Sequence, residues 1–217
     1  MGLICEMKTR KFKFIVVPKK TGICLLLICL LFGSNLSAQN AEIELLRKIN
    51  IGRNKSLDPA WSALSYSATP LSIGVPAGMI IAQLITKNPE QRKKTILVSG
   101  TVLTATIITT SLKYAINKER PYITYPDLDE NTESTGPSFP SGHTSAAFSL
   151  STSLSVAYPK WYVIAPAYTW AGGVAYSRLA LGAHYPSDVL AGAIIGSGSA
   201  WLNFKLNQWL NKKSKKH

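Results

Sequence analysis

The sequence has little cysteine and few acidic residues. Its three cysteines, Cys5, Cys24 and Cys29, all precede residue 30. The chain beyond them has no thiol with which to build a disulfide framework or a thiolate metal site. Only 11 Asp and Glu residues stand against 24 Lys and Arg residues, which gives a formal net charge of +13. With so few thiols and acids, no metal cluster is expected.

Charged residues are also almost missing from five long stretches, at residues 59–86, 95–112, 144–159, 161–177 and 189–204. Most are close to the roughly 20 residues that a helix needs to cross a bilayer, although several are short and rich in Ser, Thr and Gly. Five such stretches in 217 residues leave little polar surface for a soluble fold. The sequence therefore predicts an all-α, polytopic membrane helical bundle with about five spans. The alternative is a soluble, all-helical protein with a buried core.

The positive charge is concentrated in blocks that flank apolar stretches, at residues 8–20, 87–94 and 205–216. Basic residues beside membrane segments are typical of the cytoplasmic side. The blocks therefore indicate topology, and no nucleic-acid partner is expected in spite of the net charge.

Residues 1–38 have the pattern of a secretory signal peptide. A basic region precedes the apolar run GICLLLICLLFG, and small residues follow as far as Ala38. Leu36 occupies a position where a small residue is preferred before cleavage, so an uncleaved anchor helix is the alternative. If cleavage occurs after Ala38, the mature protein starts at Gln39.

Three further segments are expected after the signal. Residues 39–58 would form a short amphipathic helix at the membrane interface, over 41–49, and a polar connection. Residues 59–210 would form the membrane domain, and residues 211–217 a basic tail. Two prolines in the first apolar stretch, Pro70 and Pro76, predict a kinked or broken helix.

Three short motifs stand at the ends of the apolar stretches. They are K-x6-RP at Lys113, Arg120 and Pro121; PSGH at Pro140, Ser141, Gly142 and His143; and SR-x5-H-x3-D at Ser177, Arg178, His184 and Asp188. If the basic ends lie in the cytoplasm, the alternation of five spans places all three motifs at the opposite face. A shared face is an independent argument that they form one site. Their three permanent cations, two histidines and one carboxylate suit a phosphate group that is held, attacked and released.

In this order, the motifs resemble the tripartite signature of the type 2 phosphatidic acid phosphatase superfamily. That family also includes bacterial nonspecific acid phosphatases and vanadium haloperoxidases. The match is complete at every motif position and covers about residues 58 to 209. PSGH alone would be weak evidence, whereas the three motifs together are highly specific.

The resemblance implies a role for each residue, and the chemistry of each is suited to it. His184 would be the nucleophile that forms a phosphohistidine, with Asp188 orienting its ring one helical turn away. His143 would be the general acid that protonates the leaving oxygen. The remaining residues would bind phosphate: Lys113, Arg120, Arg178, and Ser141 and Gly142 at a helix start. Because three fixed cations can neutralise the phosphoryl oxygens, neither a metal nor another cofactor is expected.

The expected activity is that of an integral membrane phosphatase acting on a lipid phosphate or diphosphate. Undecaprenyl diphosphate and a lipid A phosphate are favoured, because the resemblance joins with a secretory signal and an outward-facing site. The site would face the periplasm from the bacterial inner membrane. Phosphatidylglycerophosphate and phosphatidate are also compatible, as are a phosphotransferase and a non-catalytic membrane scaffold on the same fold. The apolar stretches argue against a vanadium haloperoxidase, and the sequence does not indicate an oligomeric state.

Overall fold

The computed structural model describes residues 35–132 and 134–214. The chain divides after Asn40 into two units, of which the second, Ala41–His217, holds the helices that carry the three motifs. The described elements are α2 (Asn35–Asn50), the 3₁₀ turn η1 (Lys55–Leu57), α3 (Asp58–Tyr66), α4 (Ala68–Thr86), α5 (Pro89–Ile116), α6 (Pro121–Thr124), α7 (Gly142–Ala157), α8 (Trp161–Ala180) and α9 (Pro186–Ser214). No β-strand occurs among the described residues, so the all-α prediction is confirmed. The expected signal segment at residues 1–38 lies almost wholly outside the described part.

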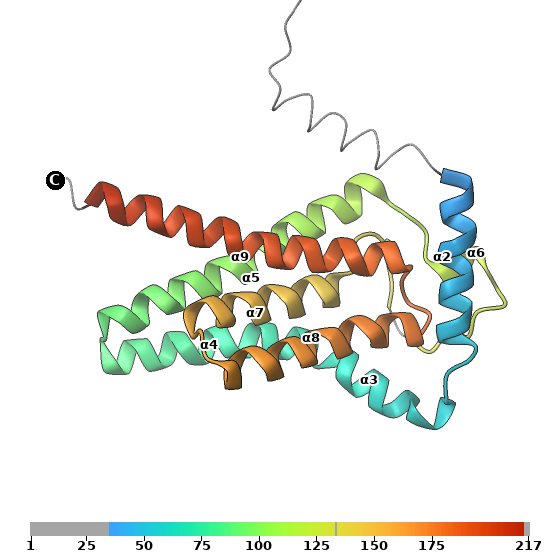
Figure 1. Cartoon of the computed structure of the whole chain (residues 1–217), viewed down its shortest axis with the longest axis horizontal. Helices are drawn as coiled ribbons and strands as arrows, with labels where there is room; N and C mark the ends of the chain where they lie inside the picture. Colours follow the sequence, from blue (N-terminus) through green and yellow to red (C-terminus); the bar gives the residue numbers. More distant parts are fainter. Residues whose placement is uncertain (1–34, 133, 215–217) are drawn as a thin grey trace, which may run out of the picture. The chain divides into compact units, whose positions relative to one another are not determined.

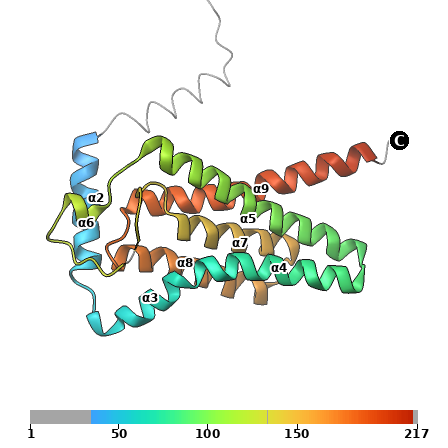
Figure 2. The same ribbon diagram turned by 180° about the vertical axis from the view of Figure 1, so that it is seen from behind.

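Helix α7 is the centre of the bundle and packs against α4, α5, α8 and α9 (Figures 1 and 2). Its sequence is rich in serine and alanine, and its buried serines satisfy their hydroxyls within the bundle. Ser149 Oγ donates to the carbonyl of Ala146 at 2.8 Å, and Ser151 Oγ donates to the carbonyl of Ala167 on α8 at 2.8 Å. Because its neighbours cover it, α7 can be only 16 residues long and still polar in composition.

The contact between α7 and α9 is close because two glycines of α9 bring the backbones together. A Cβ at Gly192 would lie 2.6 Å from the carbonyl oxygen of Ser141, and one at Gly196 would lie 2.5 Å from that of Ser145. Small residues at a four-residue spacing are a common device for close helix approach in membranes. This approach sets the α9 turn that carries Asp188 beside the start of α7, where Ser141 N donates to the carbonyl of Asp188 at 3.0 Å.

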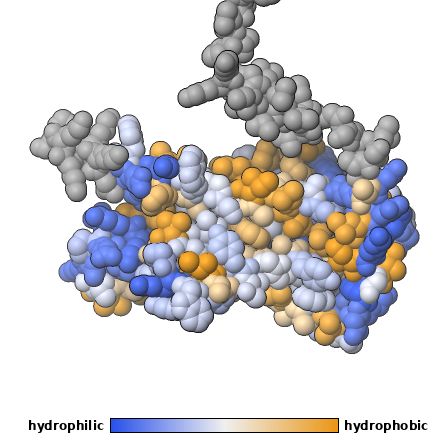
Figure 3. Space-filling view, in the orientation of Figure 1, coloured by the Kyte–Doolittle hydropathy of each residue, from blue (hydrophilic) through white to orange (hydrophobic). Residues whose placement is uncertain are grey.

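Many of the large apolar side chains that remain exposed project from α4, α5, α8 and α9, and include Ile73, Ile81, Leu103, Trp161 and Ile194. Figure 3 shows hydrophobic and intermediate residues over the middle of one face, with hydrophilic residues gathered towards the two ends. Three described stretches are long and apolar enough to cross a membrane: Lys55–Thr86, Pro89–Thr124 and Pro186–Trp209. The total of five spans stays a prediction, since α7 and α8 do not reach that length and hydropathy.

Two expectations about helix bounds are refined. The first apolar stretch is interrupted at Ser67, between α3 and α4. The interruption follows from Pro70, whose ring has no N–H and crowds the carbonyl four residues earlier, at Tyr66. At the other end, α9 continues to Ser214, into the segment expected to be a basic tail.

The helix expected at 41–49 is part of the longer α2, and its inward face is covered by protein. Ile43 and Leu46 are buried in one cluster with Leu128 and Tyr185. Asn50, fully buried, donates from Nδ2 to the carbonyls of Asp129 and Ala180, both at 2.9 Å, and accepts from Asp129 N at 2.8 Å. The second half of α2 thus ties the polar connection after α6 to the end of α8.

Replacing Gly196 with alanine should destabilise the protein, because the added methyl group meets the backbone of α7. Overpacking of this kind typically costs about 1–3 kcal/mol. Gly198 is the matched control, since a Cβ there has open space around it. Thermal unfolding in detergent should show a lower melting temperature for Gly196→Ala than for Gly198→Ala, and equal melting temperatures would contradict the close packing.

Candidate active site

The residues singled out in the sequence converge at the end of the bundle that α2 covers. A cavity of about 430 Å³ opens there, and its walls include Lys113, Arg120, Gly142, His143 and His184. Residues from all three motifs, of which Lys113 and His184 are 71 positions apart in the chain, therefore share one cavity. Arg178, Ser141 and Asp188 lie directly behind its walls, through the contacts described below.

Lys113 stands on the last turn of α5 because the helix is stopped just after it. Asn117 adopts the left-handed conformation, with φ of 49°, and its N–H donates to the carbonyl of Lys113 at 2.9 Å. Such a residue is a common way to end a helix. The Lys113 side chain lies against Gly142 and donates from Nζ to the carbonyl of Pro137 at 2.6 Å.

Arg120 is buried and bound to backbone carbonyls on both sides of the site. Its Nε and Nη2 donate to the carbonyls of Gly136 and Thr135, at 2.9 and 3.1 Å. Its Nη1 donates to the carbonyl of Ala183, next to His184, at 2.9 Å. The guanidinium therefore joins the connection after α6 to the turn that carries His184.

Arg178 comes from the last turn of α8 and is fully buried. It donates from Nη1 to Ser65 Oγ on α3, and from Nη2 to Ser134 Oγ at 2.6 Å. Ser134 itself lines the cavity. The side chain of Ser134 thus connects Arg178, the third predicted cation, to the cavity.

His184 lies on the turn between α8 and α9, with its side chain almost fully buried. Its Nδ1 is 3.6 Å from Asp188 Oδ2 and 3.4 Å from Ser138 Oγ. Acceptors on the Nδ1 side favour the tautomer that carries its proton there. That tautomer leaves a lone pair on Nε2, at the other edge of the ring.

Burial and, to a lesser degree, the charges of Arg178 and Arg120 together lower the pKa of His184 to about 3, against the opposing effect of Asp188. The imidazole is therefore neutral at physiological pH. A neutral ring with an oriented proton is the form of histidine that can act as a nucleophile.

Two side chains that the sequence reasoning missed, those of Ser138 and Lys118, bind the carboxylate of Asp188. Ser138 Oγ donates to Oδ2 at 2.5 Å, and Tyr185 N donates to the same oxygen at 3.0 Å. Lys118 Nζ pairs with Oδ1 at 2.9 Å and lies 3.9 Å from the centre of the Tyr185 ring. Lys118 lies inside K-x6-RP, and Ser138 lies two positions before PSGH. This closeness to the motifs was the only sequence signal for the two residues.

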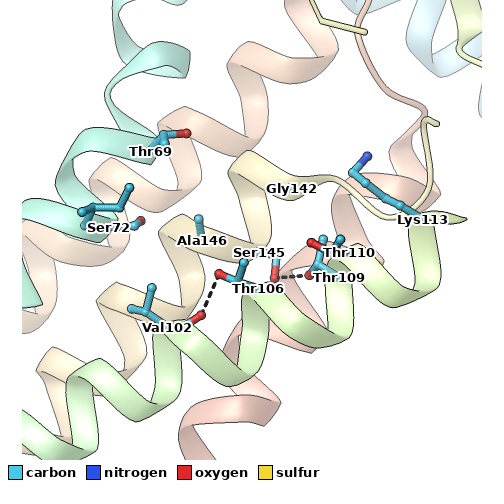
Figure 4. Close-up of a pocket in the computed structure, with 11 residues that line it drawn as sticks. Thr69, Ser72, Val102, Thr106, Thr109, Thr110, Lys113, Gly142, Ser145 and Ala146 are labelled. Atoms are coloured by element: carbon cyan, nitrogen blue, oxygen red, sulfur yellow. Dashed lines mark hydrogen bonds between the residues drawn. The ribbon is translucent and has the colours of Figure 1, made fainter. Parts of the chain in front are cut away.

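Beside the first cavity lies a second, of about 280 Å³, between α4, α5 and α7 (Figure 4). The two share Thr69, Lys113 and Gly142. The second cavity continues away from the cations, along Ile73 and Val102. These residues belong to stretches that are long and apolar enough to cross a membrane. Among the described residues, no three His, Cys, Asp or Glu side chains group in a way that could hold a metal ion.

Replacing Lys118 with methionine should lower kcat and shift its pH dependence. An ion pair between a partly exposed lysine and a buried carboxylate contributes about 1 kcal/mol or more, which corresponds to a change in rate of roughly fivefold or more. Without the lysine, the uncompensated charge of Asp188 raises the pKa of His184, so the pH below which kcat falls moves upward. Lys118→Arg should retain both properties, and Lys48→Met, on the exposed face of α2, is the control. An unchanged pH profile in Lys118→Met would contradict this role.

Comparison with known proteins agrees with the motifs. A model of the PAP2 superfamily matches residues 94–212. The chain is 29% identical over 154 residues to the lipid A 4'-phosphatase of Bacteroides thetaiotaomicron, which covers 66% of this chain and 68% of that protein. It is 28% identical to an undecaprenyl-diphosphatase of Sulfolobus acidocaldarius, over 75% of each chain.

Solved structures show the same architecture. LpxE of Aquifex aeolicus superimposes with a TM-score of 0.66 at 30% identity, covering 76% of this chain and 95% of that one. A transmembrane phosphatidylglycerolphosphate phosphatase of Bacillus subtilis has the same TM-score at 22% identity, with 87% and 94% covered, which shows the fold alone. The chain therefore belongs to the PAP2 superfamily, as a multi-pass helical membrane protein.

Proposed function

We propose that this PAP2 enzyme hydrolyses a lipid phosphate or diphosphate through a phosphohistidine intermediate, with a lipid A phosphate or undecaprenyl diphosphate as the leading substrates. The observation that carries the proposal is the neutral His184 in the wall of a cavity lined by Lys113 and Arg120, with Asp188 behind its ring. The two curated relatives bear these substrates in their names.

In the first step, His184 Nε2 attacks phosphorus and the bond from phosphorus to the leaving oxygen breaks. Lys113, Arg120 and Arg178 neutralise the phosphoryl oxygens, and His143 gives a proton to the leaving oxygen. Asp188 stabilises the positive charge on the ring. In the second step, His143 takes a proton from water, which attacks the phosphohistidine, so that phosphate leaves and His184 returns to its neutral form.

The neighbouring cavity between α4, α5 and α7 supports a lipid as the substrate. It leads from Lys113 along apolar side chains of two membrane-length stretches. A hydrocarbon chain of the lipid can lie there while the phosphate stays among the cations. The site would open towards the periplasm from the inner membrane, because the basic blocks are typical of the cytoplasmic side.

Replacing His184 with alanine should abolish release of inorganic phosphate from lipid phosphates. His143→Ala should slow the reaction less on substrates with good leaving groups, such as diphosphates, because a general acid matters less there. Phosphate release by purified protein in detergent measures both. Equal losses in His143→Ala on monophosphate and diphosphate substrates would show that the division of roles is wrong.

The same assay should run in excess EDTA, since the proposed mechanism uses fixed cations in place of a metal. A strict requirement for magnesium in the wild-type enzyme would refute this mechanism. Melting temperatures of the two variants, compared with wild type, separate a chemical loss from a loss of folding.

Sidedness can be tested with single cysteines placed at the two ends. Glu44 is exposed on α2 at the site end, and Arg92 is exposed near the start of α5. In intact cells, a membrane-impermeant thiol reagent should label Glu44→Cys and spare Arg92→Cys, which should react only after the membrane is opened. The unaltered chain, whose cysteines all precede residue 30, is the blank. Labelling of Arg92→Cys alone would invert the topology and direct the search to lipids of the cytoplasmic leaflet.

A further inference from the structure

A third cavity, of about 390 Å³, lies between α3 and the connection that follows α6. It adjoins the first cavity, which is called the phosphate cavity below because the proposed mechanism places the phosphate there. The walls of the third cavity are formed by Ser62 and Tyr66 of α3 and by Glu130, Asn131 and Thr132 of the connection. The mechanism uses none of these residues. All five side chains are polar, whereas the lining of the second cavity also includes Ile73, Val102 and Ala146.

The third cavity adjoins the phosphate cavity at two points. Tyr66 lines both of them. Thr132 Oγ1 donates to Ser134 Oγ at 2.8 Å, and Ser134 lines the phosphate cavity and accepts from Arg178. A group bonded directly to a phosphate among the cations therefore reaches the third cavity.

One wall of this cavity is fixed by a charged network. Asn131 Nδ2 donates to Asp58 Oδ2 at 3.0 Å. Asp58 also binds the buried guanidinium of Arg53 with both oxygens, at 2.7 and 2.9 Å. Arg53 in turn reaches Asp129, at 3.0 Å. The connection is held in place before a ligand arrives, which favours a binding surface of defined shape.

The lining chemistry selects among possible headgroups. Hydroxyl, amide and carboxylate groups exchange hydrogen bonds with the hydroxyls of a sugar or polyol. The described lining contains no lysine or arginine, whereas the carboxylate of Glu130 repels an anion. A second phosphate, which binds best beside cations, is therefore disfavoured in this position.

Resting on the proposed function, we infer that the third cavity binds an uncharged, hydroxylated headgroup to which the phosphate is attached. The substrate is then a phosphomonoester of a sugar or polyol lipid, in preference to a lipid diphosphate. Ser62, Tyr66, Glu130, Asn131 and Thr132 determine that specificity.

The test compares substrates that share one chain and differ in what adjoins the phosphate. They are dodecyl glucoside 4-phosphate, dodecyl phosphate and dodecyl diphosphate, with glucose 4-phosphate as the headgroup without a chain. The wild-type enzyme should have a kcat/KM for the glucoside at least about tenfold above the values for dodecyl phosphate and dodecyl diphosphate. Equal values for the three chain-bearing substrates, or a preference for the diphosphate, would overturn the inference.

Charge changes at Glu130 give a crossover that loss of folding cannot imitate. Glu130→Gln should lower kcat/KM for the glucoside by about tenfold, since hydrogen bonds to a charged acceptor are the stronger ones, and leave dodecyl phosphate unchanged. Glu130→Lys should lower the value for the glucoside and raise it for the diphosphate. Glu44→Gln, the same change at an exposed site on α2, is the control and should alter none of the values. A uniform change on all substrates in the Glu130 variants, or no change on any, would overturn the assignment.

The substrates also separate this inference from the proposed function. If no substrate releases phosphate, or if release does not depend on His184, the proposed function fails and the inference fails with it. If glucose 4-phosphate is hydrolysed as well as the dodecyl glucoside, the lipid part of the proposed function fails, whereas recognition of the hydroxylated headgroup stands. If all the dodecyl compounds react alike, the phosphatase stands and the inference fails.

Discussion

The close approach of α7 and α9 is the constraint on which the rest of the structure depends. Gly192 and Gly196 let the α9 backbone meet the carbonyls of Ser141 and Ser145. A side chain at either position would push α9 outwards and separate Asp188 from the start of α7. The turn that carries His184 and the turn at the start of α7 are thus placed in register by backbone contact, which varies less than contact through long side chains.

Three like charges are held at this end of the bundle by neutral acceptors. Lys113 and Arg120 donate to the carbonyls of Pro137, Gly136, Thr135 and Ala183, and Arg178 donates to two serine hydroxyls. Buried cations that are hydrogen-bonded to neutral dipoles can still attract a bound anion, whereas a carboxylate partner would neutralise their charge. The carboxylate of Asp188 is instead paired with Lys118 and bonded to Ser138 beside His184. The cations of the motifs therefore remain able to attract an anion, and the carboxylate of Asp188 lies beside the imidazole of His184.

The parts of this arrangement that follow from local sequence could be predicted. The apolar stretches predicted the helices, Pro70 the interruption of the first, and the motifs the convergence of Lys113, His143 and His184 at one end. The pairing of Lys118 with Asp188 and the bond from Arg178 to Ser65 could not be predicted. The first joins residues 70 positions apart and the second joins residues 113 positions apart, and these residue types are common on surfaces. The burial of α2 was missed for a related reason. An amphipathic helix has the same pattern whether lipid or protein covers its apolar face.

The buried amide of Asn50 has a consequence for the order in which the protein is assembled. Its partners, Asp129 and Ala180, follow it by 79 and 130 residues. During synthesis the amide precedes both acceptors, so it must remain in water or in a polar surface until α8 has been made. Contacts of such long sequence separation form late, because closing the large loop between the residues costs chain entropy before the contact can stabilise the fold. The end of the bundle that α2 covers is thus completed last, and a chain released after α7 would have its first two motifs but no fixed place for α2.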